Sequence, residues 1–123
     1  MMSKKFYVDK KNINSSIIRD VLLRNDSLIM SKDTISDVSE CRAYLSDKIK
    51  NSKEPIYGLN TGFGSLCNTK INFSDIETLQ KNLILSHACG TGDMVPLEIV
   101  RIMLFLKIRS LSFGYSGVRL KLI

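Results

Sequence analysis

The sequence of 123 residues has no tryptophan, only two prolines and only one histidine, and its cysteines are odd in number. Cys41, Cys67 and Cys89 are widely spaced and follow no signal peptide. A disulfide framework is therefore disfavoured, and we expect a reducing compartment, by default the cytoplasm. With His87 as the one histidine and no Cys-x-x-Cys pair, a zinc site lacks ligands at usable spacing, so we expect no metal site.

The chain also lacks a long uncharged apolar run. Its most apolar stretch, residues 97–113, is interrupted by Glu98, Arg101, Lys107 and Arg109. A membrane-spanning helix needs about 20 nearly uncharged residues. We therefore expect a core helix in this stretch and no membrane partner. With 44% apolar and 24% charged residues and no repeat, the composition is typical of a globular protein with room for one domain.

Acidic residues are too few to balance the basic ones. The formal charge of +6 arises from 18 Lys and Arg against 12 Asp and Glu. Four of the lysines lie near the start of the chain, namely Lys4, Lys5, Lys10 and Lys11. A nucleic-acid interface would also place aromatic residues among the basic ones, or a basic stripe on a helix, and neither pattern occurs. A solvated basic surface is favoured, and we expect no nucleic-acid partner.

Apolar periodicity predicts a mainly α-helical fold with short strands and a glycine-rich loop. In the first half of the chain we expect a strand at residues 6–8 and a helix from Ser15 or Ser16 that residues 25–27 end. A second helix begins after Ser31 and is stopped by residues 51–53 and Pro55. In the second half, a capping box of Ser74 and Glu77 begins a helix that Gly90 terminates. Pro96 begins the last helix.

The last helix is apolar around much of its circumference and needs partners on several sides. The amphipathic helices before it have one apolar stripe each, too little to cover it. We therefore expect the isolated chain to expose an apolar patch and to self-associate.

Three glycines, Gly58, Gly62 and Gly64, fall within seven residues, too many for a helix interior and too irregular for a strand. Residues 56–67 are therefore predicted to form a loop whose backbone N–H groups can turn toward an anion. The spacing fits neither Gly-x-Gly-x-x-Gly nor Gly-x-x-x-x-Gly-Lys-Ser/Thr, which disfavours nucleotide binding.

Tyr57 and His87 are the candidate functional side chains. A phenol is ionised to only about one part in a thousand at pH 7, so a tyrosine acts as a base only where cations or hydrogen bonds favour the phenolate. From spacing alone, a half-buried strand aromatic is the favoured interpretation of Tyr57. A hydrogen-bonded core histidine is favoured for His87 in the same way.

Three sequence motifs change the interpretation of both Tyr57 and His87. They are Tyr57-Gly-Leu-Asn-Thr-Gly-Phe-Gly64, Leu79-Gln-Lys-Asn-Leu-Ile-Leu-Ser-His-Ala-Cys-Gly-Thr-Gly92 and Gly114-Tyr-Ser-Gly-Val-Arg119. In order and spacing they resemble the N-terminal region of the histidine ammonia-lyases, within the aromatic amino acid ammonia-lyase and aminomutase family. The resemblance is close over residues 56–119. It implies the N-terminal part of a helical ammonia-lyase fold, with residues 1–123 as a single incomplete domain.

The resemblance implies that Tyr57 removes the β-proton of an amino acid and that His87 contacts the substrate side chain. The backbone at Gly64 would lie near the bound substrate. The rest of the loop that presents Tyr57 is Gly58, Asn60, Thr61, Gly62 and Phe63. The Ser-His-Ala context is similar to histidine-specific members, which convert L-histidine to urocanate and ammonia. Tyrosine or phenylalanine ammonia-lyases and aminomutases remain alternatives, because tyrosine-acting members also carry histidine here.

The family's electrophile is a methylidene-imidazolone formed from a cyclised Ala-Ser-Gly. Ala43 is followed by Tyr44 and Ala88 by Cys89, so these residues contain no such tripeptide. We expect no cofactor in this segment and no activity from it alone. The resemblance also implies that the assembled enzyme is a homotetramer. The alternative is a non-catalytic, truncated helical module that associates with itself or with full-length subunits.

Overall fold

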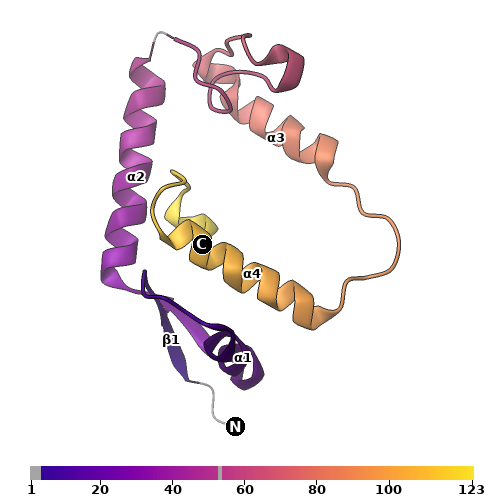
Figure 1. Ribbon diagram of the computed structural model, residues 1–123. Helices are drawn as coiled ribbons and strands as arrows, with labels where there is room; N and C mark the ends of the chain where they lie inside the picture. The colour runs from indigo at the N-terminus through magenta and orange to yellow at the C-terminus, as the bar shows by residue number, and fades with distance from the viewer. Residues whose placement is uncertain (1–3, 53) are drawn as a thin grey trace. The chain divides into compact units, whose positions relative to one another are not determined.

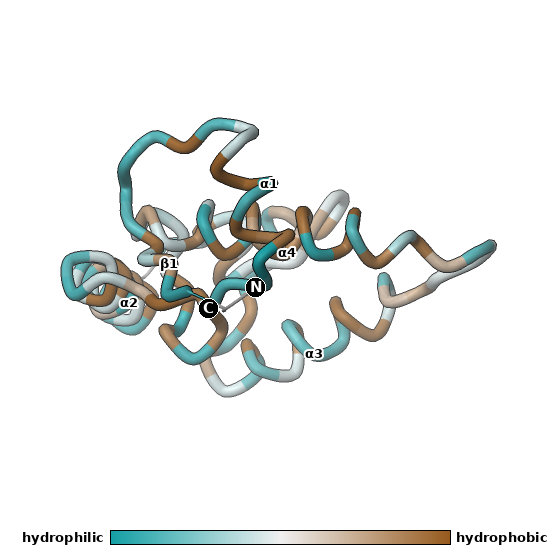
Figure 2. Tube along the Cα trace, turned by 90° about the horizontal axis from the view of Figure 1, so that it is seen from below, coloured by the Kyte–Doolittle hydropathy of each residue, from teal (hydrophilic) through white to brown (hydrophobic). Residues whose placement is uncertain are grey.

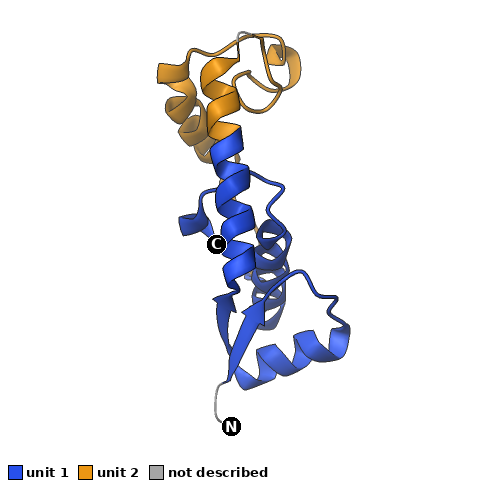
Figure 3. Ribbon diagram, turned by 90° about the vertical axis from the view of Figure 1, so that its left-hand side faces the viewer, with its two compact units in different colours: residues 1–44, 94–123 blue, residues 45–93 orange. Residues whose placement is uncertain are grey.

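The computed structural model describes residues 4–52 and 54–123, and the fold is mainly α-helical, as predicted (Figure 1). The helices are α1 (Ser15–Arg24), α2 (Lys32–Asn51), α3 (Ile76–His87) and α4 (Leu97–Ser112). The strands are β1 (Lys5–Val8) and β2 (Ser27–Met30), and the 3-10 turns are η1 (Gly64–Leu66), η2 (Phe73–Asp75) and η3 (Leu120–Leu122). Two compact units are distinguished, residues 1–44 with 94–123 and residues 45–93 (Figure 3).

The first unit is built on two parallel strands. β1 pairs with β2 from Lys5 opposite Ser27 to Val8 opposite Met30, and α1 provides the crossover that parallel strands need. Val8 is buried. The ring centroids of Phe6 and of Phe105 on α4 lie 5.7 Å apart. The strand predicted at residues 6–8 is confirmed, whereas β2 was not expected, because four residues offer too little periodicity to recognise a strand.

The start of α1 corrects one prediction. Asn14, rather than Ser15 or Ser16, caps the helix, because its Oδ1 accepts the N–H of Ile17 at 3.0 Å. The hydroxyl of Ser16 instead donates to the same oxygen at 2.7 Å. The predicted end is confirmed, since Asn25 adopts a left-handed conformation with φ of 55°.

Both ends of α3 differ from the prediction. Ser74 lies within η2, and its hydroxyl donates to the Asp75 carboxylate instead of capping the helix. The proposed capping box is therefore wrong, because a separate 3-10 turn occupies the residues that would form it. The helix ends at His87 with Ala88 as its C-cap, so Gly90 lies beyond the point of termination.

Helix α4 begins one residue after Pro96. Hydrogen bonds join it to the segment that follows β1. The buried guanidinium of Arg109 donates to the carbonyl oxygens of Asp9, at 2.7 Å, and Lys11. It also lies 5.5 Å from the ring of Phe113. These contacts let a buried charge replace its hydration with carbonyl acceptors.

Most of the apolar surface of α4 is uncovered. Phe105 and Leu111 are buried, but the exposed large apolar residues of this helix are Leu97, Ile99, Ile102, Met103, Leu104 and Leu106. Figure 2 shows hydrophobic residues recurring along the helix. Within the described part of the chain, no helix has the length and apolarity that a membrane span requires.

We expect the isolated chain to self-associate through the exposed apolar side chains of α4, because apolar surface of this kind favours burial against another copy. Size-exclusion chromatography with light scattering should show dimers or larger species at micromolar concentration. Replacing Leu104 and Leu106 with lysine should shift the chain toward monomer, whereas Leu23→Lys, on exposed α1 surface, should not. A monodisperse wild-type monomer would contradict the expectation.

Candidate active-site loop

The loop that carries Tyr57 begins with a tight turn. The carbonyl oxygen of Ile56 accepts the N–H groups of Leu59 at 3.0 Å and Asn60 at 3.2 Å, so Tyr57 lies inside the turn. Gly58, directly after Tyr57, has φ of +74°, a conformation that residues with a side chain rarely adopt. The prediction of a loop with special backbone demands is confirmed.

Asn60 and Thr61 are buried beneath this turn, with 3% and 0% of their surfaces exposed. The Asn60 Oδ1 accepts the N–H of Ile56 at 2.6 Å, and the Asn60 Nδ2 donates to the carbonyl of Glu54 at 3.3 Å. The Thr61 Oγ1 accepts the N–H of Gly58 at 3.3 Å and donates to the carbonyl of Gly62. Both side chains therefore satisfy backbone groups that the loop leaves without secondary-structure partners.

The returning segment closes the base of the loop. Thr61 forms an antiparallel bridge with Lys70, and the N–H of Ile71 donates to the carbonyl of Asn60 at 2.8 Å. A Cβ at buried Gly62 would lie 2.5 Å from the Cβ of Leu66, so only glycine allows this close approach. The base of the loop is thus packed and hydrogen-bonded.

The tip of the loop is open. Tyr57 lies in a turn, not a strand, and 64% of its surface is exposed. Its ring meets the ring of Phe63 edge to face, with centroids 5.8 Å apart. Gly64, with φ of +56°, has no heavy atom other than those of its own and its two neighbouring residues within 4 Å of the position where a Cβ would lie. Tyr57, Phe63 and Gly64 therefore present an accessible surface on a fixed base.

His87 is the last residue of α3 and is exposed, so it is not a core histidine. Its Nδ1 lies 2.9 Å from the carbonyl oxygen of Leu83 and 2.9 Å from the Ser86 hydroxyl. Because a carbonyl can only accept, Nδ1 of the neutral ring carries the hydrogen, which leaves Nε2 as an acceptor. His87 and Tyr57 belong to the same unit, but no hydrogen bond or ring contact in the described structure joins them.

The third motif, residues 114–119, lies in the other unit and is fixed against α2. A Cβ at Gly114 would lie 2.9 Å from the Cβ of Asp37, and the carbonyl of Gly117 accepts from Arg42 at 3.2 Å. Lys10 pairs with Asp37 at 2.7 Å and lies over the ring of Tyr115. The hydrogen bond to Asp37 raises the pKa of Lys10 above its ordinary value.

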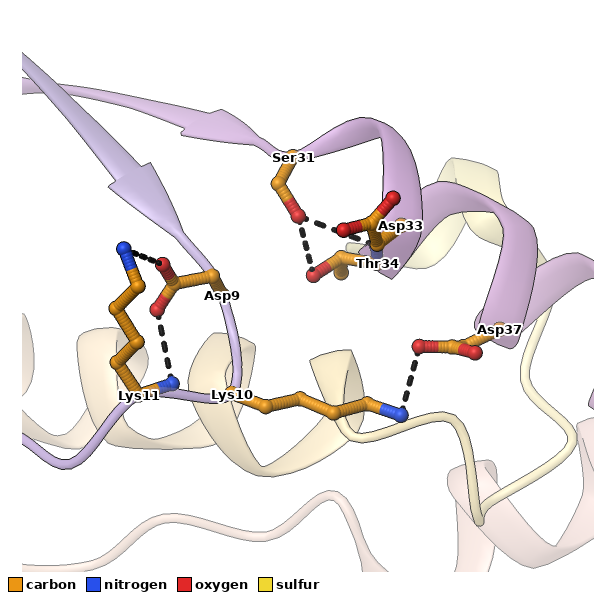
Figure 4. A pocket seen from close by; sticks show the side chains of 7 residues that line it. All are labelled: Asp9, Lys10, Lys11, Ser31, Asp33, Thr34 and Asp37. Atoms are coloured by element: carbon orange, nitrogen blue, oxygen red, sulfur yellow. Dashed lines mark hydrogen bonds and ion pairs between the residues drawn. The ribbon is translucent and has the colours of Figure 1, made fainter.

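A hollow of about 380 Å³ lies beside this motif (Figure 4). Its lining residues are Asp9, Lys10, Lys11, Ser31, Asp33, Thr34 and Asp37. The carboxylates of Asp9 and Asp37 already pair with lysines, and the Thr34 hydroxyl donates to the carbonyl of Val8. The hollow therefore offers few free groups for a ligand. Across the described residues, no three His, Cys, Asp or Glu side chains are placed to hold a metal ion.

Comparison with known proteins identifies the class. Residues 14–123 match the family model described as aromatic amino acid lyase, and the chain belongs to this family. It is similar to the histidine ammonia-lyase of Legionella pneumophila (strain Lens), with 38% identity over 122 residues, 99% of this chain and 24% of that protein. It is also similar to the histidine ammonia-lyase of Vibrio cholerae serotype O1, with 46% identity over 96 residues, 78% of this chain and 19% of that protein.

The fold is similar to that of solved enzymes. The crystal structure of the ergothioneine-degrading enzyme ergothionase from Treponema denticola matches with a TM-score of 0.88 and 27% identity, over 97% of this chain and 24% of that chain. The chain therefore spans about a quarter of the length of these proteins. The crystal structure of the histidine ammonia-lyase from Trypanosoma cruzi matches with a TM-score of 0.80 and 28% identity, over 95% of this chain and 23% of that chain, which confirms the expected ammonia-lyase fold.

Proposed function

We propose that this chain supplies the proton-accepting part of a histidine ammonia-lyase, which converts L-histidine to urocanate and ammonia. One observation carries the proposal: an exposed tyrosine stands on a buried, hydrogen-bonded loop base, in a chain similar to histidine ammonia-lyases over 99% of its length. An accessible side chain on a fixed backbone suits a group that must meet a substrate at one atom.

In the proposed reaction, the Tyr57 oxygen takes a proton from the β-carbon of L-histidine. The electrons of that C–H bond become the double bond between the α- and β-carbons, and the C–N bond breaks to release ammonia. Histidine thus becomes urocanate, with no net oxidation. A phenol acts as a base where hydrogen-bond donors or cations favour its charged form, and the assembled site would have to supply them.

The family uses a methylidene-imidazolone, and the chain's own residues do not fit the formation of this group. Neither of its alanines, Ala43 and Ala88, is followed by Ser-Gly. The electrophile of the proposed enzyme would therefore be formed by other residues. The part of the reaction that belongs to this chain is proton removal by Tyr57 and contact with the substrate by His87 and the backbone at Gly64.

The hydrogen-bond acceptor Nε2 of His87 supports histidine as the substrate. Nε2 is left free by the contact of Nδ1 with the Leu83 carbonyl, and the imidazole of a histidine substrate has an N–H to donate to it. A phenol O–H is also a donor, which makes tyrosine the second candidate. An unsubstituted phenyl ring has no such group, so phenylalanine fits less well.

We further propose that the enzyme works as a homotetramer in the cytoplasm. The exposed apolar side chains of α4 support burial against other parts of such an assembly. Three free cysteines suit a reducing compartment.

A chimera tests the proposed function. These 123 residues would replace the aligned segment of the Legionella pneumophila histidine ammonia-lyase, which shares 38% identity with them. We expect the chimera to assemble and to form urocanate from L-histidine, followed by its ultraviolet absorbance. The intact relative and this chain alone are the positive and negative controls. A chimera that assembles like the intact relative but forms no urocanate would overturn the proposal.

A further inference from the structure

We propose that Asn60 and Thr61 are positioning residues, which fix from both sides the backbone that carries the Tyr57 phenol. The inference rests on the proposed role of Tyr57 as the proton acceptor. Neither side chain needs to touch the substrate, because each acts through the peptide groups next to Tyr57.

Asn60 holds the residue before Tyr57. Its Oδ1 accepts the N–H of Ile56 at 2.6 Å, and its backbone N–H donates to the carbonyl of Ile56 at 3.2 Å. That carbonyl belongs to the peptide group that joins Ile56 to Tyr57. One asparagine therefore fixes both polar backbone groups of the preceding residue.

Thr61 holds the peptide group after Tyr57. Its Oγ1 accepts the N–H of Gly58 at 3.3 Å. Gly58 has φ of +74°, where the backbone is free of side-chain restraint and a neighbouring hydroxyl helps to select one conformation. Tyr57 is thus held between two anchored peptide groups.

Both anchors are themselves fixed by contacts that do not involve Tyr57. Asn60 donates from Nδ2 to the carbonyl of Glu54, and its own carbonyl accepts the N–H of Ile71. Thr61 is fully buried and bridges to Lys70. Buried polar groups of this kind are costly to leave without partners, so the arrangement resists displacement.

Among the described residues, the phenol has no comparable support of its own. Its ring contact there is the edge-to-face one with Phe63, and most of its surface is exposed. The position of the reacting oxygen therefore depends on the backbone that carries it. A displacement of about 1 Å can lower a reaction rate by about 100-fold, so a loosened turn should affect the chemical step more than substrate binding.

Matched variants of the chimera test the inference. Thr61→Val keeps the shape but removes the acceptor for Gly58, and we expect kcat for L-histidine to fall about 10- to 100-fold, with KM changed less than about threefold. Thr61→Ser keeps the hydroxyl and should restore most of kcat. Asn60→Leu and Asn60→Asp form a second pair, because aspartate keeps an acceptor for Ile56. Turnover is calculated per assembled enzyme, measured by size-exclusion chromatography.

A double-mutant cycle separates positioning from general stability. If Thr61 acts through Tyr57, Thr61→Val should change the residual turnover of Tyr57→Phe by less than about twofold. An equal loss in both backgrounds, or full kcat in Thr61→Val, would overturn the inference. If Thr61→Val does not assemble, the same cycle with Asn60→Leu decides, with Asn60→Asp as the rescue. Full turnover in Tyr57→Phe alone would instead overturn the proposed function.

Discussion

The chimera carrying Tyr57→Phe is expected to turn over L-histidine about 100- to 10,000-fold more slowly than the chimera with Tyr57 intact. The substitution removes only the phenol oxygen, and the fold does not depend on this atom. The side chain is exposed, its hydroxyl makes no hydrogen bond within the described structure, and the edge contact with Phe63 is available to a phenylalanine ring as well. Melting temperature and assembly should therefore stay unchanged while kcat falls.

Tyr7→Phe is the matched control for this experiment. Tyr7 lies on β1 in the other unit, and its exposure of 57% is close to that of Tyr57. Loss of its hydroxyl should leave kcat within about twofold, since surface substitutions away from a site have small effects. Turnover of Tyr57→Phe close to that of the control would remove Tyr57 from the proposed mechanism.

The sequence predicted helices better than their ends, for a physical reason. The apolar period of α2 and α4 extends over several turns, so it is visible in the sequence. The cap of α1 depends on one hydrogen bond, and Asn14, Ser15 and Ser16 are all chemically able to make it. The strand β2 was missed because it gains its identity from pairing with β1, a contact that the local pattern does not contain.

In the glycine-rich loop, too, the irregular backbone could be predicted from the sequence, whereas the individual contacts could not. The crowding of Gly58, Gly62 and Gly64 predicted an irregular backbone, and the positive φ at Gly58 and Gly64 confirms it. The anchoring contacts of Asn60 and Thr61 could not be predicted, because they depend on where the turn brings the N–H groups of Ile56 and Gly58. The available signal was weak: two short polar side chains, of the kind that bond nearby backbone, follow closely after the tyrosine.

The tip and base of this loop have opposite requirements in the proposed enzyme. Tyr57 must be reachable by a substrate, so it is exposed, and exposure removes the packing that would hold it. The buried base compensates, because Thr61 and Gly62 cannot shift without breaking hydrogen bonds, and Leu66 leaves no room for a side chain at Gly62. Rigidity in the backbone thus replaces rigidity in the side chain.

His87→Phe is expected to change which amino acid the chimera prefers. The ring contact with the Leu83 carbonyl leaves Nε2 as an acceptor, and phenylalanine has none to offer. A substrate imidazole would lose its partner on binding, whereas an unsubstituted phenyl ring would gain an apolar neighbour. The ratio of kcat/KM for L-histidine to that for L-phenylalanine should therefore fall on the order of 100-fold.

Ser86→Ala provides the control for His87. It removes a hydroxyl 2.9 Å from Nδ1 but leaves the Leu83 carbonyl to hold the ring in the same tautomer. The ratio of kcat/KM values should then stay within about threefold of that of the unmodified chimera, because Nε2 remains an acceptor. If His87→Phe also leaves the ratio unchanged, the imidazole is not a substrate contact, and specificity must arise from side chains elsewhere in the assembled site.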